Sequence, residues 1–129
     1  MDYRPFLILF LLTTTFGFEL FSQQPSVAHS IFLIGDAGEP DQAADNLSLL
    51  KRHLEIAGEN SSLIFLGDNI YPVGLGDKGN PNRALQEHKL RLQLEVAKDY
   101  KGNTFVIPGN HDWARGKQEG WQHVLNQQK

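Results

Sequence analysis

Polar side chains with metal-binding or acid–base chemistry follow three short apolar runs, each at the point where a glycine ends the run. They are Asp36 after residues 30–34, Asp68 after residues 62–66, and Asn110 with His111 after residues 104–107. Two carboxylates brought together without a cation repel each other, and one pKa then has to rise. A divalent or trivalent cation removes that conflict, and carboxylate, amide and imidazole groups suit Mg²⁺, Mn²⁺, Fe or Zn²⁺. These residue types therefore predict a metal centre where the fold brings them together.

The apolar runs have the pattern of strands in a parallel sheet. They are almost continuously apolar and do not alternate, which is typical of strands buried on both faces. Because the carboxyl ends of such strands form the ligand-binding edge of an open α/β sheet, we expect the polar residues to converge there.

Helical patterns separate the predicted strands. The first is expected to begin with Asp41 as its cap and to carry an apolar stripe: Ala43, Leu47, Leu50 and Leu54. The second is expected over residues 82–100, with Leu85, Leu92 and Val96 on one stripe, and a third begins around Trp121. The β-α-β-α-β order predicts an α/β fold with right-handed crossovers.

Three motifs hold the polar residues: GDAG at 35–38, GDNIY at 67–71 and GNHD at 109–112. Each alone is weak, because a Gly-Asp pair after a strand often caps the next helix. Together, in this order and spacing, they resemble the calcineurin-like metallophosphoesterases, and most closely the purple acid phosphatase branch. The resemblance spans roughly residues 31–113.

This resemblance implies a fold, a reaction and a cofactor. The fold would be the N-terminal β-α-β-α-β half of a four-layer α/β/β/α sandwich. The reaction would be that of an acid phosphatase-like hydrolase, in which a metal-activated hydroxide at a two-metal centre cleaves a phosphate ester. The two metal ions are expected to be Fe(III) together with Fe, Zn or Mn.

The resemblance also implies a role for each motif residue. Asp36 would bind the first metal, Asp68 would bridge both, and Tyr71 would be a phenolate ligand of the first. Asn110 would bind the second metal through its carbonyl oxygen, while His111 would stay outside the coordination shell and protonate the leaving group. Asp112 would orient His111.

Tyr71 distinguishes the subtype. Many relatives carry a histidine two residues after the first aspartate, where this chain has Gly38, and the pair of Gly38 and Tyr71 matches the purple branch. The alternative is that Tyr71 is a packed turn residue, in which case the metals would be Mn²⁺ or Zn²⁺.

Two further motifs of the family pattern, a lone His on a later strand and a Gly-His-x-His, do not occur in the 129 residues. We therefore expect residues 30–129 to be the N-terminal part of a larger phosphoesterase domain. Two alternatives stay open: an inactive truncated product with a partial metal site, or an exported module that binds a small anion. The remaining histidines are expected to be solvated or structural: His29, His53, His88 and His123.

The N-terminus has the features of an export signal. Residues 6–18 form an uncharged apolar run of 13 residues, shorter than the ~20 that a membrane-spanning helix needs. We expect a signal peptide over residues 1–22, a linker over 23–29, and a periplasmic, secreted or outer-surface protein with no stable membrane span. An uncleaved N-terminal anchor is the alternative.

Composition narrows the partners and the chemistry. A net charge of −3 gives no electrostatic footprint for nucleic acid. The chain has no cysteine, which excludes disulfides, iron–sulfur clusters and thiol nucleophiles. The expected partner is a phosphorylated small molecule or protein that serves as substrate.

Overall fold

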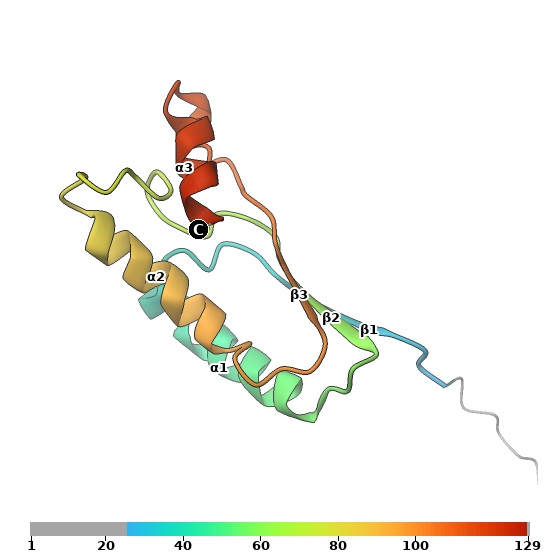
Figure 1. Ribbon diagram of the computed structural model, residues 1–129. Coiled ribbons are helices and arrows are strands. Elements are labelled where there is room, and N and C mark those ends of the chain that lie inside the picture. The colour runs from blue at the N-terminus through green and yellow to red at the C-terminus, as the bar shows by residue number, and fades with distance from the viewer. Residues whose placement is uncertain (1–25, 129) are drawn as a thin grey trace, which may run out of the picture.

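A computed structural model describes residues 26–128, so the predicted signal peptide at 1–22 lies outside the described residues. The elements in chain order are β1 (Ser30–Ile34), α1 (Pro40–Ile56), β2 (Ser61–Phe65), α2 (Arg83–Glu95), β3 (Asn103–Val106), the short 3₁₀ turn η1 (Ala114–Gly116) and α3 (Gly120–Gln127). The strands are parallel in the order β1-β2-β3 (Figure 1). This confirms the predicted β-α-β-α-β unit and is consistent with the N-terminal half of the four-layer fold that the resemblance implies.

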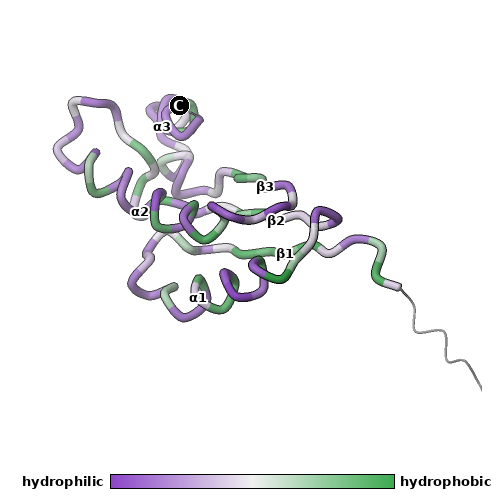
Figure 2. The backbone as a smooth tube through the Cα atoms, turned by 60° about the horizontal axis from the view of Figure 1, so that its bottom comes forward, coloured by the Kyte–Doolittle hydropathy of each residue, from purple (hydrophilic) through white to green (hydrophobic). Residues whose placement is uncertain are grey.

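The core lies between the sheet and helices α1 and α2. Its central cluster combines residues of α1 and β2: Leu50, Leu54, Leu63 and Phe65. The predicted apolar stripe of α1 is buried throughout, which confirms the helical period read from the sequence. Figure 2 shows the strands as a hydrophobic band and the long loop before α2 as mostly hydrophilic. The helix layer thus fixes one face of the sheet and leaves the strand ends free to carry polar loops.

Burial of the strands on both faces was expected, and the described residues do not show it. Burial alternates along β1, and every residue of β3 is exposed. Leu33, Ile64 and Phe105 pair across the three strands, and Leu33 is 58% exposed. For β1 the reason is that α1 and α2 cover one face of the sheet, while no element within residues 26–128 covers the other (Figure 1). For β3 the reason is that the helices pack on β1 and β2, and no residue of β3 belongs to the core cluster.

No helix within residues 26–128 is both long and apolar enough to cross a membrane.

Helix α1 begins at Pro40 with Glu39 at the N-cap, so Asp41 lies in the first turn and does not cap the helix as expected. Proline suits this start because its fixed φ fits the first helical turn and its missing N–H is not needed there.

Helix α2 is shorter than predicted and buries a different face. It ends at Glu95, and its buried residues are Gln86 and Gln93, whereas Leu85 and Leu92 of the expected stripe are exposed. The physical cause is hydrogen bonding. The Gln93 amide donates to the carbonyl of Asn69 at 2.6 Å, and the Gln86 amide oxygen accepts from the backbone N–H of Gly76 at 3.0 Å. Helix α2 therefore holds the loop that follows β2.

Candidate metal centre

The loops after β1 and β2 bring Asp36 and Asp68 to the same edge of the sheet. Both residues have a left-handed backbone, with φ of 55° and 54°. Few residues other than glycine adopt this conformation, and aspartate is among those that tolerate it best. The two loops are joined by hydrogen bonds from the Asp36 N–H to Gly67 O at 3.2 Å and from the Gly38 N–H to Asp68 O at 2.9 Å. Neighbouring parallel strands thus place the two carboxylates in one site.

The Tyr71 hydroxyl joins these carboxylates. It donates to Oδ1 of Asp36 at 2.6 Å and lies 3.2 Å from Oδ2 of Asp68. The single phenolic hydrogen forms the shorter hydrogen bond, to Asp36. The Tyr71 oxygen and Oδ2 of Asp68 therefore lie close together with no hydrogen between them. Three oxygen atoms that could act as metal ligands, from two loops, therefore lie close together.

This contact changes the acidity of Tyr71. The hydrogen bond to Asp36, followed by burial and the hydrogen bond to Asp68, raises the pKa of the phenol well above its usual value. In the metal-free chain the phenol proton lies between the phenolic oxygen and Oδ1 of Asp36. A multivalent cation at this point would replace the proton and satisfy all three oxygens.

Gly38 is pressed against the GDNIY loop. A Cβ at Gly38 would lie 2.8 Å from the carbonyl carbon of Asn69 and 2.8 Å from the backbone nitrogen of Ile70. Real Cβ atoms do not approach other atoms this closely, so no larger residue fits here unless the backbone moves. The third potential metal-ligand oxygen is therefore that of Tyr71 and does not come from a side chain at position 38. The backbone N–H of Tyr71 donates to Gly38 O at 3.4 Å.

The third loop reaches the site through Asp68. The backbone N–H of His111 donates to Oδ1 of Asp68 at 2.9 Å, and Gly109 lies so close to Asp68 that a Cβ there would overlap its backbone nitrogen. Asn110 stands between these two contacts and is exposed. Its backbone carbonyl accepts from Arg115, whereas no hydrogen bond of its side chain is recorded within residues 26–128. Of the four predicted ligands, the structure brings Asp36, Asp68 and Tyr71 into direct contact and places Asn110 beside them.

The His111 ring lies over Tyr71, with ring centroids 4.3 Å apart and planes inclined by 55°. Its Nδ1 is 2.8 Å from the carbonyl oxygen of Pro72. A carbonyl can only accept, so Nδ1 carries a hydrogen and donates it there. This leaves Nε2 as the ring nitrogen that does not bond Pro72.

Asp112 is fully buried and its hydrogen bonds go to the loops, not to the His111 ring it was expected to orient. Its carboxylate accepts five hydrogen bonds, from the backbone N–H groups of Asn69, Ile70 and Gly109 and from the side-chain amides of Asn69 and Gln127. Because Asn69 and Gly109 belong to two different motifs, Asp112 fixes the GDNIY loop to the GNHD loop. It acts on the site through the backbone.

Lys89 is a further residue beside the site that none of the sequence motifs indicates. Its ammonium forms an ion pair with Glu39 and donates to the carbonyl oxygen of Tyr71 at 3.1 Å, with the side chain only 13% exposed. It thereby ties the start of α1 to the Tyr71 backbone. The signal was weak, because a lysine on a helix is usually solvated. Its burial follows from the packing of α2 against the loop.

His123 and His29 fulfil the structural roles expected of them. His123 is buried and Nδ1 contacts the carbonyl oxygen of Val73 at 2.5 Å, while Nε2 of exposed His29 is 3.0 Å from the Ser62 hydroxyl. His53 and His88 are exposed on α1 and α2. None of these four side chains makes a recorded contact with the Asp36, Asp68 and Tyr71 group.

The donor set is one of hard oxygen atoms. Within residues 26–128, no three His, Asp or Glu side chains gather in a metal-binding arrangement, and the third oxygen here belongs to a phenol. Carboxylate, phenolate and amide oxygens fit a trivalent or hard divalent cation. The residues present therefore fit a metal ion and supply part of a ligand set.

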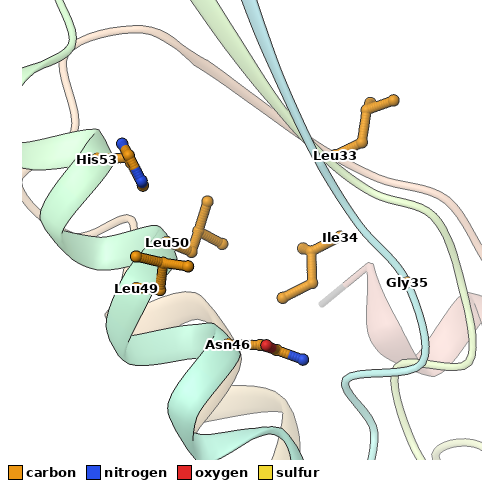
Figure 3. Close-up of a pocket in the computed structure, with 7 residues that line it drawn as sticks. All are labelled: Leu33, Ile34, Gly35, Asn46, Leu49, Leu50 and His53. Atoms are coloured by element: carbon orange, nitrogen blue, oxygen red, sulfur yellow. The ribbon is translucent and has the colours of Figure 1, made fainter.

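A groove elsewhere on the surface does not belong to this site. It has a volume of about 390 Å³ and lies between β1 and α1, where Ile34 and Leu50 point toward one another (Figure 3). Most of its lining is apolar, and His53 is its one titratable group. It contains none of the predicted ligands and holds no arrangement of groups suited to catalysis.

Comparison with known families gives one match. The model of the family described as calcineurin-like phosphoesterase matches residues 29–128, which include all three motifs. No curated protein and no solved structure matches the chain.

Proposed function

Since the chain belongs to the calcineurin-like phosphoesterase family, we propose that it hydrolyses phosphate esters at a two-metal centre to which Asp36, Asp68, Tyr71 and Asn110 contribute. The observation that carries this proposal is the contact of one phenolic oxygen with two carboxylates at 2.6 and 3.2 Å. Membership of the family implies a metal-dependent hydrolase. The residue roles, the metals and the substrate are parts of the proposal.

The chain's own residues have distinct tasks in this reaction. Asp36, Asp68, Tyr71 and Asn110 hold the metals, which supply an acidified water and neutralise the charge of the phosphoryl oxygens. Asp68 also fixes the third loop, because its Oδ1 accepts the N–H of His111. Asp112 keeps the loops in register, so the ligands are ordered before any metal binds.

His111 donates a proton to the leaving group. With Nδ1–H anchored on Pro72 O, the ring acts as the acid in its doubly protonated form, which carries a second hydrogen on Nε2. As the oxygen of water bonds to phosphorus and the ester P–O bond breaks, the leaving oxygen takes the proton from Nε2. The proton lost by water returns to the imidazole, so the enzyme is restored and one water is consumed per ester.

We further propose that the site is of the phenolate type. Gly38 leaves no room for a histidine at the position where other branches carry one, and Tyr71 supplies the missing donor. Loading with Fe(III) is expected to give a visible phenolate-to-iron charge-transfer band. Tyr71→Phe should abolish the band, while Tyr100→Phe, whose hydroxyl bonds Ser61 outside the site, should keep it. A band that survives in Tyr71→Phe contradicts the assignment.

The central experiment measures metal uptake and turnover together. Asp68→Asn is expected to lose metal and the hydrolysis of p-nitrophenyl phosphate in the same variant, whereas the exposed α1 carboxylate variant Asp45→Asn should keep both. Full turnover in Asp68→Asn would refute the bridging role. Metal uptake by the wild type without any turnover would favour the alternative, a product with a partial metal site and no activity.

Export is a separate proposal that rests on residues 1–22. We infer that these residues are a signal peptide and that the mature protein starts at Gln23. N-terminal sequencing of the protein recovered from its native host tests this directly. A mature N-terminus at Met1 in a membrane fraction would instead support the uncleaved anchor.

A further inference from the structure

The turn that follows His111 has an unusual backbone. Ala114, Arg115 and Gly116 take left-handed conformations in succession, with φ of 50°, 56° and 78°. This conformation costs free energy for residues that have a Cβ. It is held by hydrogen bonds from the Ala114 N–H to His111 O at 3.0 Å and from the Arg115 N–H to Asn110 O at 2.8 Å. The strain is thus maintained by the same residues that form the third motif.

The result of this turn is that Arg115 lies against His111. Its Nε is 3.5 Å from Nδ1 of His111, but that nitrogen already donates to Pro72 O at 2.8 Å. Within residues 26–128 no carboxylate lies in ion-pair distance of Arg115, in contrast to Arg83, which pairs with Glu87. The guanidinium is exposed. The Arg115 guanidinium therefore lies beside His111, the candidate acid, with N–H groups exposed to solvent.

Strained residues persist where the surrounding structure holds them, and they cluster at functional sites. A guanidinium offers paired N–H donors that match the oxygens of a phosphoryl group better than any other side chain does. A monoester has three non-bridging oxygens and up to two negative charges, whereas a diester has two such oxygens and one charge. A cation beside His111 therefore binds a monoester more tightly than a diester.

We propose that Arg115 binds a non-bridging oxygen of the substrate phosphate beside His111 and so selects phosphate monoesters over diesters. This inference rests on the proposed function, because it assumes that phosphate occupies the site between His111 and the metal ligands. It assigns to the GNHD loop a residue that lies outside the motif itself.

Calorimetric titration of the Zn²⁺-loaded chain with methyl phosphate and with dimethyl phosphate tests this selectivity. We expect the wild type to bind methyl phosphate more tightly. Arg115→Gln should weaken methyl phosphate binding about tenfold and leave dimethyl phosphate unchanged. Arg115→Lys should retain part of the preference, because it keeps the charge but not the fork. Lys117→Gln, which removes an exposed cation two residues away, is the matched control and should behave as the wild type.

Equal methyl phosphate affinities in the wild type and Arg115→Gln would overturn the assignment, as would an equal loss for both ligands. Arg115→Asn provides a second variant, because asparagine accepts the left-handed backbone if glutamine disturbs the turn. Zinc uptake, measured alongside, should be unchanged in every Arg115 variant.

The outcome for zinc separates this inference from the proposed function. A wild-type chain that takes up no zinc contradicts the proposed function. The comparison is then made on the zinc-free chain, where weaker methyl phosphate binding by Arg115→Gln upholds the role of Arg115 and equal binding overturns it.

Discussion

The hydroxyl of Tyr71 lies 2.6 Å from Oδ1 of Asp36, although the two residues stand 35 positions apart in the chain. Asp36 follows β1 and Tyr71 belongs to the loop after β2, so the contact exists because these strands are parallel neighbours. The same hydroxyl lies 3.2 Å from Asp68. The Tyr71 hydroxyl therefore contacts both carboxylates of the candidate metal centre.

The protonation of Tyr71 leads to a prediction about pH. The folded metal-free chain holds the phenol proton more tightly than the unfolded chain, because Asp36 accepts it and burial disfavours the phenolate. This contribution to the free energy of unfolding is fully present below the usual pKa of 10.0 and is lost as the pH rises through the raised pKa. Denaturant unfolding on both sides of pH 10.0 should show the loss in the wild type but not in Tyr71→Phe. Identical pH profiles would contradict it.

The close approach at Gly38 predicts a local loss of stability. Gly38→Ala places a Cβ against the backbone of Asn69 and Ile70, and we expect a loss of about 1–3 kcal/mol in the free energy of unfolding. Gly79→Ala is the matched control, since a Cβ at Gly79 meets nothing within 4 Å. Chemical denaturation of the two variants decides the matter, and an equal effect of both would show that the loops are looser than described.

Asp112 is expected to be the most sensitive carboxylate in the described residues. Asp112→Asn replaces an acceptor oxygen by an N–H₂ group that faces N–H donors, so about 2–3 kcal/mol of stability should be lost. Urea unfolding of Asp112→Asn and of the exposed variant Asp99→Asn provides the comparison. A mild effect at Asp112 would mean that other contacts join the two loops.

The strand ends were predictable because two simple signals coincide there. Continuous apolar runs indicate strands, and the glycine and aspartate that follow indicate a turn at the edge of the sheet. Parallel order then brings Asp36 and Asp68 together whatever the details of the loops. The sequence therefore sufficed for the β-α-β-α-β order and for the proximity of the loops that carry Asp36 and Asp68.

The contacts that hold the loops were not predictable in the same way. Gln86 and Gln93 are buried because each amide binds a loop carbonyl or N–H. A helical period based on hydrophobicity predicts instead that the leucine face is the buried one. Asp112 looked like a partner of its neighbour His111, whereas its carboxylate is surrounded by backbone N–H groups from two motifs. Such bonds depend on three-dimensional proximity that local sequence does not encode.

The left-handed turn predicts a conflict between stability and binding at Arg115. Arg115→Gly removes the Cβ that makes φ of 56° unfavourable, so the metal-free chain should gain up to about 1 kcal/mol in the free energy of unfolding. The same variant should lose methyl phosphate affinity as Arg115→Gln does. Thermal unfolding and calorimetry of one preparation give both quantities. A marked loss of stability would show that the turn depends on the arginine side chain itself.

We propose that Asp36, Asp68 and Tyr71 hold the same metal centre. Anomalous diffraction from crystals soaked in Fe(III) and Zn²⁺, recorded at each metal's absorption edge, tests it most directly. We expect an anomalous peak within ligand distance, about 2.0–2.3 Å, of the Tyr71 oxygen and of both carboxylates. A peak elsewhere in the chain, or a Tyr71 hydroxyl still bonded to Asp36 with no peak beside it, would show that these three residues do not form a metal centre.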